Sequence, residues 1–132
     1  RKCVTRAWSS GGRESRIFGY TLAAHWENDK DGGSRTSLGP CIVTPDHLTE
    51  ARIQVHLRID GEPMGVKVLK QPNDFFGTVV ANGSHDPPFE AGDVVAWTGW
   101  TLGGKTRGNE TGPAIEVSAE PIGVLSSKPH PA

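Results

Sequence analysis

His25 has the residue type and the position that suit acid–base chemistry. It follows the small pair Ala23-Ala24 at the end of a mostly apolar run, residues 17–24, which predicts a buried strand with room for a pocket where it ends. Histidine exchanges protons near neutral pH, so His25 is our candidate general acid or base. The alternative interpretation is a structural histidine that holds its neighbours by hydrogen bonds.

Three acidic side chains follow this histidine at alternate positions, namely Glu27, Asp29 and Asp31. Carboxylates bind hard cations, so a metal site is one interpretation of the cluster. A solvated turn is the interpretation that we favour, and it leaves the segment without a metal ion.

Tryptophans lie beside this segment and near the end of a second predicted strand. Trp26, Trp97 and Trp100 could line an apolar cavity in which an indole N–H orients a ligand. Core packing is the alternative, and we favour it for Trp26 and Trp97 when each is considered alone. Trp100 follows Thr98-Gly99 at the start of a polar loop, where both roles remain open.

Alternation of apolar and polar residues predicts the strands that position these side chains. Residues 52–59 alternate strictly, which turns their aliphatic side chains to a core and their charged side chains to water. Asp60-Gly61 then predicts a β-hairpin turn, and Pro63 should lie at that turn or on an edge strand. The predicted strands are 17–24, 52–59, 64–69, 93–98 and 114–120.

Glycine and proline divide the chain into short segments, with 17 glycines and 10 prolines among 132 residues. No stretch keeps helical apolar spacing for three turns, so we expect no long helix. Residues 46–50 form at most one helical turn, 70–74 a turn, and 82–88 and 100–113 loops. The predicted fold class is mainly β, with a basic N-terminal arm (1–16), a single β-rich domain (17–127) and a frayed tail (128–132).

The charge balance excludes several kinds of partner. The formal net charge is −1, from 14 basic and 15 acidic residues, which favours neither nucleic acid nor a membrane as a partner. No apolar run approaches the roughly 20 residues needed to span a bilayer. Cys3 and Cys41 match no metal or redox spacing, so we expect two reduced thiols in a cytoplasmic protein. One disulfide in a secreted protein is the alternative.

Several short segments occur in an order that resembles one known family. Gly19-Tyr20-Thr21 is followed by His25-Trp26, and then by Leu38-Gly39-Pro40 with Ile42-Val43-Thr44. Val-x-x-x-x-x-Gly-Glu at 55–62, Gly-Asp at 92–93 and Ile-Gly-Val-Leu at 122–125 complete the series. The ordered set resembles the C-terminal domain of the fumarylacetoacetate hydrolase superfamily.

The resemblance implies a mixed β-roll or sandwich that spans about residues 17–125. Members of the family build their pocket where the segment matching 17–24 meets the segment matching 98–104. A pocket at that place in this chain would bring His25, Thr98 and Trp100 together.

The chain departs from the family at the residues that carry its chemistry. The family binds a divalent cation through a Glu-x-Glu pair and one Asp, but residues 1–15 contain Glu14 alone, and the Asp position falls on His25. The family's catalytic lysine has no clear match in 32–37, and a threonine that contacts substrate falls on Trp100. With these departures, the resemblance implies a protein without a metal ion or other cofactor.

We therefore favour a metal-independent enzyme of this kind, a hydrolase, lyase, tautomerase or cyclase, which acts on a small carbonyl-containing compound in an apolar pocket. His25 is the candidate catalytic residue, and the candidate substrate-binding residues are Tyr20, Trp26, Thr98 and Trp100. The alternative is a non-catalytic binding or partner subunit that pairs with a metal-containing paralogue. Because family members generally assemble as dimers, we expect a homodimer or such a heterodimer.

Overall fold

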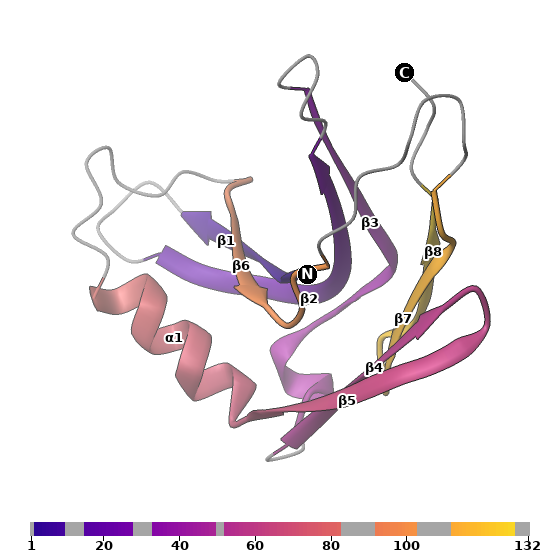
Figure 1. The fold of residues 1–132 in the computed structure, drawn as a ribbon. Coiled ribbons are helices and arrows are strands. Elements are labelled where there is room, and N and C mark those ends of the chain that lie inside the picture. The colour runs from indigo at the N-terminus through magenta and orange to yellow at the C-terminus, as the bar shows by residue number, and fades with distance from the viewer. Residues whose placement is uncertain are drawn as a thin grey trace.

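Two antiparallel sheets make up the described part of the chain. The computed structural model describes residues 2–9, 15–27, 33–49, 52–82, 92–102 and 112–128. Within these ranges, the first sheet has the strand order β3-β2-β1-β6 and the second sheet has the order β5-β4-β7-β8 (Figure 1).

The predicted mainly β fold is confirmed, because strands account for most of the described residues. The first sheet contains β1 (Lys2–Ser9), β2 (Ser15–Glu27), β3 (Ser34–Val43) and β6 (Val94–Thr98). The second sheet contains β4 (Arg52–Ile59), β5 (Glu62–Lys70), β7 (Ile115–Ala119) and β8 (Gly123–Ser127). Between β3 and β4, Pro45–His47 forms the single helical turn expected there.

The β4–β5 hairpin follows the prediction from alternation. Val55 and Leu57 are buried, while the polar residues that alternate with them along β4 are exposed. Asp60 and Gly61 join the two strands with φ values of 50° and 86°. Two positive φ values define the turn whose twist matches that of a hairpin, and Asp-Gly favours it. Pro63 lies on β5, an edge strand of the second sheet, as expected.

The core lies between the two sheets. Tyr20, Leu22 and Ala24 alternate along β2 and belong to one buried cluster with residues of β4, β7 and β8. Trp26 packs against the same cluster from the end of β2. Because successive side chains of a strand point to opposite faces, the residues between these four point away from the second sheet.

The outer face is our name for the side of the first sheet that points away from the core. It carries His25 and Glu27 of β2 with Thr36 and Leu38 of β3. Residues that pair across antiparallel strands share a face, and Thr36 pairs with His25 as Leu38 pairs with Ala23. This arrangement sets a polar pair beside an apolar side chain on one surface.

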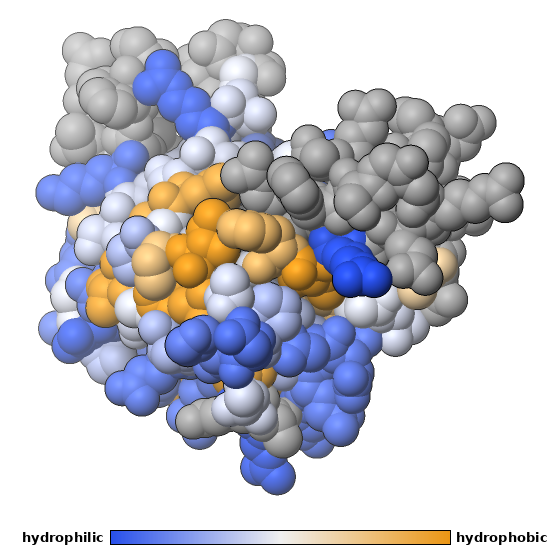
Figure 2. Space-filling model, turned by 180° about the vertical axis from the view of Figure 1, so that it is seen from behind, coloured by the Kyte–Doolittle hydropathy of each residue, from blue (hydrophilic) through white to orange (hydrophobic). Residues whose placement is uncertain are grey.

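Figure 2 shows apolar side chains gathered on the face of the molecule seen from behind. Exposed apolar side chains belong to both sheets and to the helix after β5. Four of them belong to β2, β3 and β8, and β3 lies in contact with β8. We call these four the apolar patch: Phe18, Leu38, Ile42 and Val124. Each is about half exposed.

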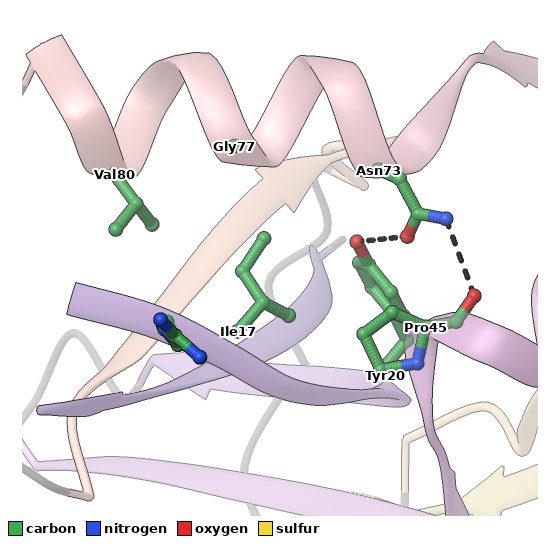
Figure 3. Close-up of a pocket in the computed structure, with 7 residues that line it drawn as sticks. Ile17, Tyr20, Pro45, Asn73, Gly77 and Val80 are labelled. Atoms are coloured by element: carbon green, nitrogen blue, oxygen red, sulfur yellow. Dashed lines mark hydrogen bonds between the residues drawn. The ribbon is translucent and has the colours of Figure 1, made fainter. Parts of the chain in front are cut away.

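The helix α1 (Pro72–Asn82) corrects the prediction that residues 70–74 form only a turn. Its 11 residues form about three turns, which agrees with the expectation that the chain contains no long helix. Phe76 and Val80, one turn apart, are buried on the side that faces β2. At its start, Asn73 accepts a hydrogen bond from Tyr20 (Figure 3). Pro-Asn-Asp favours a turn and equally suits the first turn of a helix, so the sequence alone did not separate the two.

The N-terminal segment also differs from its prediction. Residues 2–9, expected within a basic arm, form β1, which pairs with β2 on one side and with β6 on the other. Backbone pairing on both sides holds this strand although its sequence lacks clear alternation. The loops expected at 82–88 and 100–113 and the tail expected at 128–132 lie largely outside the described residues.

Among the described residues, no helix is both long and apolar enough to cross a membrane. Cys41 is an exposed free thiol whose sulfur donates to the carbonyl of Ile122 at 3.1 Å.

Candidate functional site

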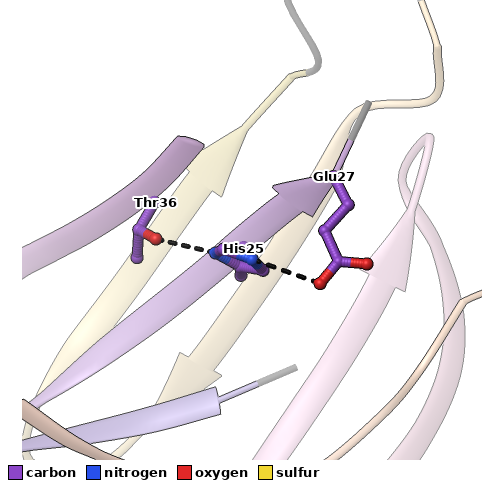
Figure 4. Close-up of polar contacts among 3 residues, drawn as sticks. All are labelled: His25, Glu27 and Thr36. Carbon is purple, nitrogen blue, oxygen red and sulfur yellow. Dashed lines mark hydrogen bonds and ion pairs between the residues drawn. The ribbon is translucent and has the colours of Figure 1, made fainter. Parts of the chain in front are cut away.

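His25 is held between two polar partners on the outer face (Figure 4). Its Nδ1 lies 2.8 Å from Thr36 Oγ1, across the β2–β3 pairing. Its Nε2 lies 3.4 Å from a carboxylate oxygen of Glu27, two residues along the same strand. Strand geometry explains both contacts, because a cross-strand partner and an i+2 neighbour share a face.

The imidazole remains accessible in this arrangement. The His25 side chain is 25 % exposed and that of Glu27 is 78 % exposed. With the proton on Nδ1, the imidazole donates to the Thr36 hydroxyl, and Nε2 carries the lone pair that can accept a proton beside the Glu27 carboxylate. With the proton on Nε2, the Thr36 hydroxyl donates to Nδ1 instead. Either form places a hydroxyl, an imidazole and a carboxylate in one row, an arrangement suited to proton transfer.

Thr36 is the member of this group that the sequence did not reveal. It lies eleven residues after His25, and only the register of the β2–β3 pairing brings the two together. Glu27 was visible as a neighbour but was assigned to a solvated turn. The spacing His25-x-Glu27 within a predicted strand was the available signal for that contact.

Trp26 occupies the opposite side of the strand from His25. Its indole Nε1 donates to Ser127 Oγ at 2.8 Å, and Ser127 Oγ lies 3.1 Å from Ser37 Oγ. Trp26 also packs against the core cluster, which matches the packing role favoured for it when taken alone. Because consecutive residues of a strand face opposite ways, one cavity on the outer face does not collect both His25 and Trp26.

Trp100 packs toward the second sheet. The Lys67 Nζ atom lies 5.6 Å from the centre of its ring, within cation–π range. The indole also borders Gly65 of β5 and packs against the core cluster. Trp100 therefore approaches the first sheet from its core side, whereas His25 lies on the outer face. Its role in substrate binding stays a prediction.

Thr98 ends β6 at a position level with the last part of β2. It pairs with Lys2 of β1, and the next residue, Cys3, pairs with Leu22 of β2. Two strand spacings of about 4.8 Å thus separate its backbone from β2. The register places its backbone at the same end of the first sheet as His25.

Tyr20 is buried at 1 % exposure, and its ring packs against Phe76 with the centroids 5.7 Å apart. Its hydroxyl donates to Asn73 Oδ1 at 2.5 Å. The Asn73 amide donates in turn to the carbonyls of Pro45 and Leu48, each at 3.3 Å. Tyr20 therefore joins β2 to α1, and its assignment to substrate binding stays a prediction.

The described residues do not fit the three-carboxylate metal site that the family resemblance implies. The sequence of β1, which precedes the Gly-Tyr strand, contains no acidic residue. His25, which the sequence resemblance expects at the position of the family's Asp, is engaged with Thr36 and Glu27. Across the described ranges, no three His, Cys, Asp or Glu side chains lie close enough together to hold a metal ion. Glu14 lies outside these ranges.

In the described part of the chain, two packed antiparallel sheets, the helix α1 against the long strand β2, and a polar row at the end of that strand define a small β-rich domain. The family model described as fumarylacetoacetate (FAA) hydrolase, C-terminal, matches residues 13–128, so the chain belongs to that family. The resemblance inferred from the ordered motifs is confirmed. No curated protein matches the chain.

Solved structures show the same fold. A fumarylacetoacetate hydrolase from the psychrophile Exiguobacterium antarcticum is similar over the whole of this chain and 58 % of its own, with 23 % identity and a TM-score of 0.64. A 2-keto-3-deoxyarabinonate dehydratase is similar over 99 % of this chain and 50 % of its own, with 15 % identity and a TM-score of 0.55. A 2-keto-3-deoxy-D-arabinonate dehydratase in complex with magnesium and 2,5-dioxopentanoate is similar over 96 % of this chain and 50 % of its own, with 16 % identity and a TM-score of 0.57. This chain thus spans about half the length of the solved structures that it matches, between 50 % and 58 %.

Proposed function

We propose that this chain is an enzyme domain of the fumarylacetoacetate hydrolase kind that acts on a small carbonyl compound without a divalent metal ion, with His25 as its general base and acid. The observation that carries the proposal is the placement of His25 between Thr36 and Glu27. The family resemblance expects a metal-binding Asp at this position. An imidazole in that place supplies proton transfer.

The proposed step is removal of a proton from a carbon next to a carbonyl group. Nε2 of His25 accepts the proton, the C–H electron pair forms a carbon–carbon double bond, and the carbonyl oxygen becomes an enolate oxygen. Glu27 stabilises the imidazolium that forms, while the Thr36 hydroxyl accepts the Nδ1 hydrogen and fixes the ring. Return of the proton to carbon or oxygen completes a tautomerisation, and the same enolate is an intermediate for elimination or carbon–carbon cleavage.

The names of the similar proteins support this substrate class. A 2-keto-3-deoxy sugar acid and 2,5-dioxopentanoate both carry a carbonyl group next to a carboxylate or at a chain end. Such compounds have acidic C–H bonds beside the carbonyl, which is where a histidine base acts. The turnover assay described next distinguishes among hydrolase, lyase, tautomerase and cyclase activity.

The test is turnover by the full chain in the presence of EDTA, with three probes: fumarylacetoacetate, 2-keto-3-deoxyarabinonate and oxaloacetate. We expect turnover of at least one probe, and a loss of about 10²-fold or more in His25→Gln, the usual worth of a general acid or base. The matched control is His56→Gln, because His56 is exposed on β4 and should leave the rate unchanged. Activity that EDTA abolishes and Mg²⁺ restores, or full activity of His25→Gln, would contradict the proposal.

The apolar patch favours a second candidate function, that of a subunit completed by a partner. Leu38 lies on the outer face with His25, so a chain that covers the patch also borders the candidate site. Self-association or pairing with a paralogue would bury these side chains. Sedimentation of the wild-type chain and of Leu38→Lys tests this, with Val68→Lys as control, since Val68 is similarly exposed on the second sheet. Association that only Leu38→Lys disrupts supports the role, and a wild-type monomer at micromolar concentration with no partner recovered counts against it.

A further inference from the structure

The end of β2 that carries His25 belongs to a two-stranded ribbon. Among the described residues, β1 pairs with β2 as far as Leu22, whereas β3 pairs with β2 as far as Glu27. His25 and Thr36 therefore face each other beyond the part of β2 that β1 supports. A two-stranded ribbon is marginally stable by itself and twists more strongly than a wider sheet, so it needs support from packing.

The second sheet supplies such support from the core side. Strand β8 contacts both β2 and β3, and its last residue, Ser127, is 8 % exposed. The Ser127 hydroxyl oxygen accepts the indole N–H of Trp26 at 2.8 Å and lies 3.1 Å from the hydroxyl oxygen of Ser37. Ser127 thus joins a side chain of β2 to a side chain of β3.

These two side chains are the immediate neighbours of the candidate catalytic pair. Trp26 follows His25 on β2. Ser37 follows Thr36 on β3. Because consecutive residues of a strand point to opposite faces, Ser127 holds from the core side the same backbone that carries His25 and Thr36 on the outer face. The distance of 2.8 Å between His25 Nδ1 and Thr36 Oγ1 depends on that backbone.

We propose that Ser127 is a positioning residue for His25, which holds the ends of β2 and β3 together and so fixes the contact between the imidazole and the Thr36 hydroxyl. Ser127 acts through Trp26 and Ser37 on the core side, so it takes no part in the proton transfer itself. Its effect on a reaction rate rests on the function proposed above, whereas its effect on the imidazole does not.

The test that is independent of turnover is NMR of the ring nitrogens of His25, assigned by comparison with His25→Gln. Ser127→Ala removes the shared hydrogen-bond partner of the two strands, and we expect it to shift the Nδ1 resonance in the same direction as Thr36→Val does. Ser37→Ala, which removes one of the two bonds, should shift it less. The matched control is Ser126→Ala, because Ser126 is exposed one position earlier on β8 and should leave the resonance unchanged.

Turnover of whichever probe the wild-type chain uses supplies the second measurement. Ser127→Ala should lower kcat about 10-fold with KM unchanged, because the imidazole loses its orientation and the substrate contacts remain. Combined with Thr36→Val, it should slow the reaction no further than Thr36→Val alone, since both substitutions release the same imidazole. Losses that multiply would assign Ser127 a purely structural role and overturn the proposal.

The two measurements separate this positioning role from the proposed reaction. An unchanged His25 resonance in folded Ser127→Ala, as judged by its melting temperature, would overturn the positioning role whatever the rates. If Ser127→Ala does not fold, Ser37→Ala decides the question in its place. A wild-type chain without turnover, in which Ser127→Ala still shifts the resonance, would contradict the proposed reaction and support the positioning role.

Discussion

Tyr20 and Asn73 lie 53 residues apart in the sequence, and a hydrogen bond of 2.5 Å joins the Tyr20 hydroxyl to the Asn73 side chain. The bond connects the central strand β2 to the first turn of α1. The Asn73 amide then continues to the backbone carbonyls of Pro45 and Leu48. One side chain therefore fixes three segments that meet at the edge of the core.

Removing this connection should lower the free energy of unfolding. Tyr20→Phe deletes one partner of a single hydrogen bond and should cost about 1 kcal/mol. Asn73→Ala leaves a buried hydroxyl and two carbonyls without their partner and should cost about 1–3 kcal/mol. Urea unfolding followed by circular dichroism measures both. Gln54→Ala, on the exposed side of β4, is the control and should stay within about 0.5 kcal/mol of wild type.

Two glycine-to-alanine substitutions should change stability in opposite directions. A Cβ atom at Gly19 would lie 2.9 Å from the backbone oxygen of Val43 and would overlap the side chain of Ile42. Backbone cannot move aside cheaply, so Gly19→Ala should destabilise by about 1–3 kcal/mol. Gly77→Ala meets open space within a helix and should stabilise by about 0.5–1 kcal/mol. Equal melting temperatures for the two variants would contradict the close approach of β3 to β2 at Gly19.

Thr36 should act on the proposed reaction through the orientation of His25. Thr36→Val keeps the shape of the side chain but removes the hydroxyl that lies 2.8 Å from Nδ1. We expect kcat to fall about 10-fold with KM unchanged, because the imidazole loses its fixed orientation and not its contact with substrate. Thr36→Ser restores the hydroxyl and should recover the rate. A serine variant as slow as the valine variant would assign Thr36 a packing role only.

The carboxyl group of Asp46 should make a small part of the stability depend on acid pH. A hydrogen bond from the Thr44 side chain, followed by one from its own backbone N–H, holds the pKa of Asp46 below its usual range. Because the folded pKa is below the unfolded one, the contribution is complete above the unfolded pKa and is lost as pH falls through the folded pKa.

Thr44→Val should therefore raise the pKa of Asp46, as measured by carboxyl NMR titration. The difference in stability between the two chains should be present at neutral pH and should shrink in acid. A difference that persists below the folded pKa of Asp46 would assign the effect to another cause. Asp46 is fully exposed, so the effect is expected to be small.

The sequence predicted those elements whose side chains repeat with a clear period. Strand β4 matched its prediction at both ends, because alternation over 52–59 and an Asp-Gly turn specify a hairpin locally. Strand β1 was missed, since Lys-Cys-Val-Thr-Arg-Ala-Trp has no consistent alternation and its pairing with β2 and β6 is a long-range property. Helix α1 was missed because Pro72-Asn73-Asp74 is compatible with a turn and with a helix start.

The candidate site was predicted only in part, for a related reason. His25 could be selected from its residue type and its place after a buried strand, but Thr36 could not, because its contact depends on strand register. The same alternation rule that predicts strands also separates Trp26 from His25. Applied to every residue of the run, that rule predicts that Trp26 faces the core, where it packs. The position of Trp100 depends on how the chain turns after β6, and no local sequence pattern specifies the direction of that turn.

The division of β2 into a core side and an outer side has a practical meaning for protein engineering. Tyr20, Leu22 and Ala24 belong to the core cluster and determine whether the chain folds, whereas His25 and Glu27 follow them on the same strand and contribute little to the interior. A library randomised at positions 25, 27 and 36 should keep most members folded while it samples many combinations of acid, base and nucleophile. A library at positions 20, 22 and 24 should keep few. Substitutions on the outer side of β2 should therefore introduce new side-chain chemistry without lowering the stability of the fold.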